Sequence, residues 1–291
     1  MNIGVSSYSF AKHVGQTGCN YLELCDLAKE LGFDGIEFTD LTAAECEKLG
    51  VSTPLECAAL IRRHCDEIGL AVVAYTVGAD FLREDVEAEV TRLCDCVDVA
   101  AALGVSVMRH DATFQIPTEY LFGWREVIEK IAPYIRRVTE YAESKGVRTC
   151  TENHGYFLQA PERVEQLIRT VGHKNYGWLC DMGNFLCADA DPANAVKIAA
   201  PYTFHVHAKD FLYKDGSLGF CPEGYFETNG GNYIRGTAVG HGVVPIAKCL
   251  RMLKKAGYDR WLSIEFEGME ENIPALKAGL SFLRKTLENI G

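Results

Sequence analysis

Four short segments of the sequence carry ionisable residues at the ends of β-rich runs. They read TENHG at 151–155, CDMGN at 180–184, HVHAKD at 205–210 and SIEFEG at 263–268. Successive side chains of a strand point to opposite faces, so each run separates an apolar face from a face that carries an ionisable group. We expect the ionisable faces to bring together Glu152, Asp181, His207 and Glu265.

These four residue types could hold a divalent cation. Three carboxylates that converge on one point would repel one another strongly unless a positive charge neutralised them. Two glutamates, one aspartate and one imidazole suit Mn²⁺, Co²⁺, Mg²⁺ or Zn²⁺, and they leave coordination positions open for water or a substrate. The alternative is that each residue is a separate solvated group at a rim, but four such groups on the correct faces favour a shared site.

The elements that must position these residues alternate between short β-rich runs and longer amphipathic runs. The predicted strands are 3–8, 35–38, 71–77, 105–110, 147–152, 176–181, 203–208 and 261–266. The predicted helices, in which apolar residues recur with helical periodicity, are 21–31, 54–68, 83–103, 119–145, 161–171, 192–199, 244–256 and 270–288. Several helices end at a glycine, such as Gly32, Gly104 and Gly257, and a glycine there lets the chain turn back toward a sheet.

This alternation predicts an α/β protein with a parallel sheet, and eight units are enough to close a (β/α)₈ TIM barrel. An open, doubly wound sheet is the competing architecture. Its glycine-rich phosphate loop is missing after the first strand, where SSYSFAKH stands at 6–13. We therefore expect residues 1–291 to form a single TIM-barrel domain with its active site at the C-terminal mouth.

The segment 211–243 is a long irregular stretch that is rich in glycine and aromatic residues. It follows the seventh predicted strand, so it would lie at the C-terminal mouth, where barrel enzymes keep their sites. Long loops inside compact domains are usually functional. We predict that this loop is an active-site lid that contributes substrate contacts, among them Arg235.

Composition and charge argue against several classes of protein. The net charge is −11, from 29 basic and 40 acidic residues, and no basic run is present, which disfavours nucleic-acid binding. No apolar run approaches the ~18–20 residues that span a bilayer, and the N-terminus lacks the pattern of a signal peptide. The 12 cysteines follow no disulfide spacing. We expect reduced thiols in a cytoplasmic protein without nucleic-acid or membrane partners.

Taken together, the four motifs resemble those of the xylose isomerase-like sugar isomerase/epimerase barrels. GHGVVP at 240–245 and AGYDRWLSIE at 256–265 add to the resemblance, which extends from ELGFDGIEF at 30–38 to the last predicted helix. The resemblance implies one catalytic divalent metal, usually Mn²⁺ in the sugar enzymes. Its implied ligands are Glu152, Asp181, His207 and Glu265.

The resemblance also implies a sugar isomerase or epimerase that acts on a ketose or a related polyol-type carbohydrate. A metal chelated by a ketose carbonyl and the neighbouring hydroxyl makes the α-proton acidic and stabilises the enediolate. Glu152 and Glu265 would then transfer the proton as an acid–base pair on opposite faces of the substrate. Two alternatives stay open: a metal-dependent keto-inositol or keto-sugar dehydratase, and a non-catalytic sugar-binding barrel.

Six further residues are candidates for contacting the carbohydrate, and each has an ordinary packing role as its alternative. They are Glu37, His110, His154, Asn184, Lys209 and Arg235. We expect His110 to point inward together with Met108. Asn184 stands where apurinic-site endonucleases of this scaffold and many of its epimerases have a histidine, which disfavours DNA repair. A small carbohydrate is thus the expected partner, and a homo-oligomer is compatible with the sequence.

Overall fold

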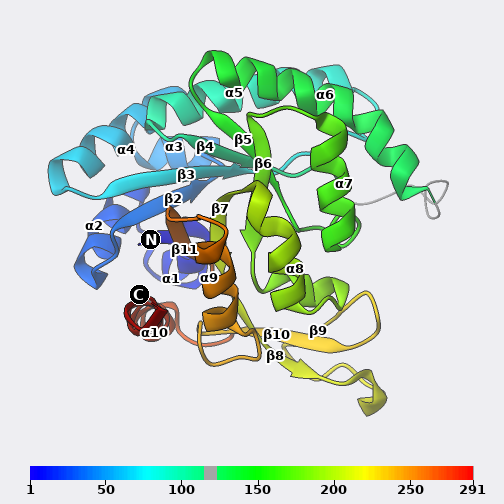
Figure 1. The fold of residues 1–291 in the computed structure, drawn as a ribbon. Helices are drawn as coiled ribbons and strands as arrows, with labels where there is room; N and C mark the ends of the chain where they lie inside the picture. The colour runs from blue at the N-terminus through cyan, green and yellow to red at the C-terminus, as the bar shows by residue number, and fades with distance from the viewer. Residues whose placement is uncertain (115–122, 291) are drawn as a thin grey trace.

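The computed structural model describes residues 1–114 and 123–290, in which eight parallel strands close a barrel (Figure 1). Around the barrel the order is β1-β11-β7-β6-β5-β4-β3-β2. The strands are β1 (Asn2–Ser6), β2 (Gly35–Thr39), β3 (Ala71–Val77), β4 (Val107–His110), β5 (Arg148–Glu152), β6 (Tyr176–Asp181), β7 (Thr203–Ala208) and β11 (Trp261–Ile264). The predicted α/β TIM barrel is therefore confirmed, and the open sheet is wrong.

Helices connect the strands and surround the barrel (Figure 1). The α-helices are α1 (Ala11–Thr17), α2 (Tyr21–Leu31), α3 (Ala43–Lys48), α4 (Pro54–Ile68), α5 (Val86–Leu103), α6 (Trp124–Ser144), α7 (Pro161–Val171), α8 (Pro192–Ala199), α9 (Ile246–Lys255) and α10 (Asn272–Ile290). Short 3₁₀ helices are η1 (Ser7–Phe10), η3 (Asn184–Ala188), η4 (Ala200–Tyr202) and η5 (Gly216–Leu218). The first four residues of the helix predicted at 119–145 lie outside the described residues.

Local sequence fixes where these helices begin and end. Asn20 caps α2, because its side chain accepts hydrogen bonds from the backbone N–H groups of Leu22 and Glu23, while Glu23 accepts one from the backbone of Asn20. This reciprocal capping box satisfies backbone donors that the first helical turn leaves unpaired. The helix stops at Gly32, whose φ of 94° lies in the left-handed region that favours glycine.

An apolar layer inside the barrel supports the polar groups at its mouth. Val107, Cys150 and Leu179 form a buried cluster, with Phe204 packed against it. The first three precede Arg109, Glu152 and Asp181 by two positions, so each pair shares one face of its strand. The larger apolar core lies between the strands and the helices. The ends of β4, β5 and β6 therefore hold their polar side chains above a buried apolar layer.

The segment after β7 is not the loop that we predicted. It contains the strands β8 (Asp210–Lys214), β9 (Phe226–Glu227) and β10 (Tyr233–Thr237), which form an antiparallel sheet of three strands in the order β8-β10-β9. Figure 1 shows this sheet outside the barrel, beside α8 and α9. Asp210 links the start of β8 to the segment that follows β10. Its carboxylate accepts hydrogen bonds from the backbone N–H groups of Phe211, Gly240, Gly242 and Val244.

All 12 cysteines are free thiols, as the sequence predicts. Most of them are buried, and Cys25 and Cys65 contact each other in the core with their sulfur atoms 3.4 Å apart. Within residues 1–114 and 123–290, no helix has both the length and the apolar character needed to cross a membrane.

Candidate active site

The four candidate metal ligands converge at the C-terminal mouth of the barrel. Glu152 ends β5, Asp181 ends β6, His207 lies in β7, and Glu265 directly follows β11. Their ligand atoms all lie within 4.8 Å of one another. From His207 Nδ1 the distances are 3.8 Å to Glu152 Oε1, 3.8 Å to Asp181 Oδ2 and 3.5 Å to Glu265 Oε2. The structure thus brings together the residues that the sequence analysis singled out.

Two atoms of this cluster are buried without a hydrogen-bond partner: Asp181 Oδ2 and His207 Nδ1. Buried polar atoms are rarely left unpaired. Burial raises the pKa of Asp181 to about 7, and Glu152 and Glu265 add to this effect, although Lys209 opposes it. A divalent cation among these atoms would satisfy both unpaired atoms and neutralise the carboxylates. The residues therefore fit a metal site, and the metal itself stays a prediction.

Hydrogen bonds from neighbouring residues hold the side chains of the candidate ligands. Asp181 Oδ1 accepts hydrogen bonds of 2.8 Å from the backbone of Gly183 and Asn184, and Glu152 Oε1 accepts one of 2.8 Å from Asn184 Nδ2. His207 donates from Nε2 to Glu37, over 2.7 Å. Such outer contacts fix the orientation of metal ligands.

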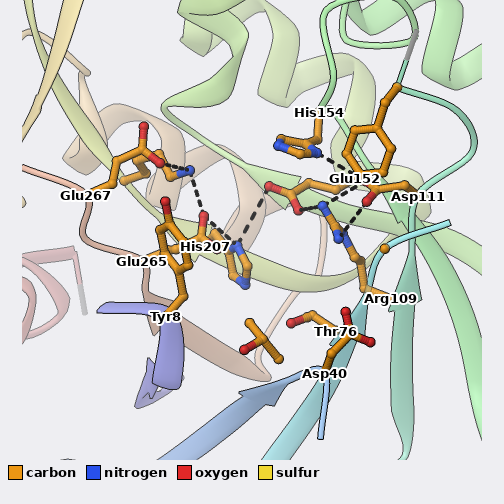
Figure 2. Close-up of a pocket in the computed structure, with 14 residues that line it drawn as sticks. Tyr8, Asp40, Thr76, Arg109, Asp111, Glu152, His154, His207, Glu265 and Glu267 are labelled. Carbon is orange, nitrogen blue, oxygen red and sulfur yellow. Dashed lines mark hydrogen bonds and ion pairs between the residues drawn. The ribbon is translucent and has the colours of Figure 1, made fainter. Parts of the chain in front are cut away.

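Arg109, Asp111 and His154 lie on one side of the cluster (Figure 2). Arg109 Nη2 lies 2.7 Å from Glu152 Oε2 and 2.8 Å from Asp111 Oδ1, and His154 Nδ1 lies 3.1 Å from the same Asp111 oxygen. Burial acts to lower the pKa of His154, but the hydrogen bond with Asp111 and the negative charges of Glu152 and Asp111 together outweigh it, so this pKa is raised. This side of the cluster therefore carries the guanidinium of Arg109, held by two carboxylates, and the imidazole of His154, whose protonated form the neighbouring carboxylates stabilise.

Glu265, Glu267 and Tyr8 lie on the opposite side of His207 (Figure 2). The buried Lys209 joins two of them, because its Nζ lies 2.6 Å from Glu265 Oε2 and 3.2 Å from Glu267 Oε2. Burial acts to raise the pKa of Glu265, but Lys209 and His207 hold it well below its usual value. A second carboxylate–cation pair thus faces the pair of Glu152 and Arg109.

The two sides enclose a pocket of about 250 Å³. Its lining residues come from the ends of all the barrel strands except β6, together with the loops that follow them. They are Tyr8, Thr39, Asp40, Thr76, Gly78, Arg109, Asp111, Phe114, Glu152, His154, His207, Lys209, Glu265 and Glu267. Pockets with convergent polar groups and perturbed pKa values are the usual location of active sites.

A family model described as "Xylose isomerase-like TIM barrel" matches residues 25–286 of the chain. The chain belongs to this family. The resemblance inferred from the four motifs is therefore confirmed.

Comparisons with individual proteins agree with this assignment. The chain is 27% identical to the "Rhizopine catabolism protein MocC" of Rhizobium meliloti over 242 residues, which cover 76% of this chain and 70% of that protein. The probable 3-DHS dehydratase AsbF of Bacillus anthracis superposes with a TM-score of 0.77 at 19% identity, over 98% of this chain and 99% of that chain.

Two further solved structures share the fold. An L-ribulose 3-epimerase superposes with a TM-score of 0.73 at 20% identity, over 99% of this chain and 95% of that chain. The IOLI protein, solved with a zinc atom, superposes with a TM-score of 0.74 at 18% identity, over 100% of this chain and 98% of that chain. At these identities the solved structures establish the common fold alone.

In this xylose isomerase-like barrel, four of the six predicted substrate contacts lie elsewhere than in the pocket. Glu37 is fully buried between His207 and His205 and does not line the pocket, so a substrate contact by Glu37 stays a prediction. Asn184 lies behind the ligands, where it bonds Glu152 and Lys209. The remaining contacts, His154 and Lys209, do line the pocket.

The predicted orientation of His110 is wrong because β4 has the opposite phase. Arg109 is the residue of β4 that lines the pocket, whereas His110 stacks on Tyr176 and meets Phe81 edge-on. Met108, expected inside with it, belongs to the core under the helices. Arg109 shares the inner face with Val107, but Met108 and His110 repeat the same apolar and polar pattern on the other face, so the sequence carried no signal that favours Arg109.

Arg235 is the fourth predicted contact that the structure places elsewhere. It lies in β10 on the outer sheet, above the ring of Tyr225 and 3.6 Å from Met269 Sδ, and it lines no part of the metal pocket. Within the described residues of 211–243, only Phe226 approaches the site, where it lines an adjoining cavity with Lys209. The lid role of this segment stays a prediction.

Proposed function

We propose that the protein is a divalent-metal-dependent sugar isomerase or epimerase that acts on a ketose or a related polyol-type carbohydrate. The observation that carries this proposal is the position of Glu152 and Glu265 on either side of His207 in one pocket (Figure 2). A proton can then be removed on one side of a bound substrate and returned on the other. The fold shared with an L-ribulose 3-epimerase supports this assignment.

The residues that would hold the cation are Glu152, Asp181, His207 and Glu265. Three carboxylates and one imidazole suit Mn²⁺, which we propose as the metal, and they are compatible with Zn²⁺, Co²⁺ and Mg²⁺. The zinc atom of the structurally similar IOLI protein supports a divalent ion. When bound, the ion supplies Lewis-acid polarisation of a carbonyl group and its neighbouring hydroxyl.

The surrounding side chains orient the acid–base pair. Arg109 fixes one oxygen of Glu152 at 2.7 Å, and Lys209 fixes one oxygen of Glu265 at 2.6 Å, so neither carboxylate turns away from the pocket. One glutamate takes the proton next to the substrate carbonyl. Its return to the same carbon gives an epimer, and its return to the adjacent carbon interconverts aldose and ketose. His154 can donate a hydrogen bond to a substrate hydroxyl.

Solvent-proton exchange tests this proposal. The protein loaded with Mn²⁺ is incubated in deuterated water with a panel of ketoses, and proton NMR follows the signal of the proton next to the carbonyl. We expect loss of that signal together with formation of an epimer or aldose. A protein that binds the metal but neither exchanges the proton of any ketose nor forms such a product would overturn the proposal.

A specific observation favours a second candidate, a keto-sugar or keto-inositol dehydratase. β-Elimination of water needs a general acid at the leaving hydroxyl in addition to a base. His154, held by Asp111 at 3.1 Å and lining the pocket, has a raised pKa that suits this role. The dehydratase among the similar structures supports this candidate. A keto-deoxy product in the same NMR experiment would identify it.

We infer the cellular compartment of the protein from its free cysteines and the class of its partner from its net charge. Free cysteines throughout the chain support a reducing compartment such as the cytoplasm. A net charge of −11 supports a small carbohydrate rather than a nucleic acid as partner.

A further inference from the structure

A second cavity adjoins the metal pocket. It encloses about 330 Å³ and shares four lining residues with the first cavity: Phe114, His154, Lys209 and Glu267. The two cavities therefore meet along a common boundary. A ligand whose sugar ring lies against the metal cluster would extend its next group into the second cavity.

Three aromatic rings contribute to the lining of the second cavity, together with Lys209 and Glu267, which pair with each other over 3.2 Å. Phe114 and Tyr156 leave 41% and 43% of their surface exposed, and the half-buried Phe226 of β9 completes the wall. Aromatic faces that border a cavity are favourable partners for flat or apolar ring surfaces, because contact removes their area from water.

The amide side chains of this cavity are already bonded to the protein. Gln159 Oε1 accepts a hydrogen bond of 2.6 Å from the backbone of Tyr156, and Gln159 Nε2 donates over 2.7 Å to the carbonyl of Asn184. The side chain of Asn184 bonds Glu152 and Lys209. The cavity therefore offers aromatic faces rather than free amides, which favours a ring over a strongly polar group.

Two residues with strained backbone angles anchor the segment beside the aromatic side chains of the cavity. Tyr156 and Asp189 are the non-glycine residues with positive φ in the described parts of the chain, at 64° and 53°. Tyr156 and Asp189 both form hydrogen bonds with the segment 227–232. Tyr156 donates from its hydroxyl to the carbonyl of Glu227 over 3.1 Å, and Asp189 accepts hydrogen bonds from Thr228 and from Asn232.

Conformations of this kind are costly, persist only where the surroundings impose them, and cluster at ligand sites. Here the imposed geometry keeps the ring of Tyr156 next to β9, the strand that carries Phe226, and both rings line the cavity. The outer sheet, which contributes no side chain to the metal pocket, thus acquires a role as a wall of the neighbouring cavity.

We propose that this cavity is a subsite for a ring attached to the sugar, so that the substrate is a conjugate that keeps a carbonyl group in the metal pocket, such as an aryl glycoside of a keto-sugar or a disaccharide with a free reducing end. The inference rests on the proposed function in that the sugar portion occupies the metal pocket. Phe114, Tyr156 and Phe226 contact the attached ring. They determine specificity, and they take no part in proton transfer.

Calorimetric binding of three probes to the Mn²⁺-loaded protein tests the subsite. The probes are methyl β-D-glucoside, phenyl β-D-glucoside and cellobiose, which differ in the group attached to the same sugar. We expect one or both ring-bearing probes to bind at least about tenfold more tightly than the methyl glycoside, because an additional ring surface is buried. Tightening by phenyl alone assigns an aryl group, and tightening by cellobiose assigns a second sugar. Equal binding, or no binding of any probe, would overturn the subsite.

Substitutions in the second cavity test which residues cause the tighter binding of the ring-bearing probes. Phe226→Ala and Tyr156→Gly should remove the tightening and leave binding of the methyl glycoside unchanged. Tyr156→Phe removes one hydrogen bond to β9 but should retain the tightening, because the ring remains and Asp189 still holds the segment 227–232. Phe220→Ala, at an exposed aromatic residue of the same segment that lines neither cavity, serves as the control. Full tightening in Phe226→Ala would contradict the assignment.

These binding measurements require no turnover, which separates the two proposals. Ring-dependent binding without any proton exchange would support the subsite and reject the isomerase. Proton exchange with free ketoses and no preference for attached rings would support the isomerase and reject the subsite.

Discussion

Glu37 Oε1 lies 2.7 Å from His207 Nε2, with both side chains fully buried. Burial acts to raise the pKa of Glu37, but His207 and His205 hold it well below its usual value. The carboxylate accepts a hydrogen bond from Nε2, so Nε2 keeps its proton, and Nδ1 is the nitrogen that faces Asp181 and the two glutamates and that would bind a metal. A residue of β2 thereby selects the tautomer of a residue of β7.

The first prediction concerns this contact. Glu37→Gln should weaken metal binding by roughly 10–100-fold, because an amide holds the imidazole less firmly in the tautomer that coordinates. Titration of the metal-free protein with Mn²⁺ measures the affinity. The matched control is Glu30→Gln at an exposed position of α2. An affinity equal to that of the parent would show that Glu37 has only a packing role.

The ligands themselves give the second prediction. Asp181→Ala and His207→Ala should each abolish stoichiometric metal and activity, since each removes one donor and leaves the others uncompensated. Elemental analysis after gel filtration measures the metal, and circular dichroism checks that the barrel persists. Asp215→Ala, at an exposed aspartate of the outer segment, is the control. Metal retained at full stoichiometry in both variants would reject the ligand assignment.

The barrel and the four ligand positions could be predicted because their signals are local and repeated. A two-residue period in each strand and a helical period between strands reproduce the order of the elements. Glu152 and Asp181 end their strands, and His207 lies one residue before the end of β7 on the face opposite Val206, so their direction follows from alternation.

The other features of the site depend on strand register and on pairing between distant segments, which local sequence patterns do not reveal. Both faces of β4 are apolar except at Arg109 and His110, so alternation alone cannot choose which of them points inward. Glu37 does point inward, but its depth beneath the pocket follows from the register of β2 against β1, which pairs it with Ser6. The outer sheet forms by pairing of β8 with β10, segments that a glycine-rich stretch separates.

The third prediction concerns pH. The buried Glu89 of α5 accepts hydrogen bonds from Arg83, Arg92 and the backbone of Asp80, in the loop after β3 that borders the pocket at Gly78. Burial acts to raise the pKa of Glu89, but these donors outweigh it and lower the pKa to about 2. Because the folded pKa is the lower one, the stabilisation is complete above the unfolded value of about 4.5 and is lost as the pH falls toward 2.

Urea unfolding at pH 7, 4.5 and 3 measures this contribution. The parent should lose on the order of 3 kcal/mol from this group over the full range of protonation. Glu89→Gln should be less stable at pH 7 and should lose less stability on acidification, whereas the exposed control Glu84→Gln should follow the parent. Parallel pH profiles of Glu89→Gln and the parent would contradict the assignment.

The last prediction separates the two glutamates from simple metal ligands. Glu152→Gln and Glu265→Gln keep the size of the side chain and one oxygen donor, so metal binding is weakened and need not be lost. Each proton transfer contributes roughly 10²–10⁴-fold to the rate. Since the two carboxylates face opposite sides of the pocket, one variant should still exchange the α-proton of one epimer with solvent, and the other variant that of its partner. A dehydratase would lack this mirror relation. If both variants hold metal and turn over within about tenfold of the parent, the glutamates act only as ligands and the two-base mechanism is wrong.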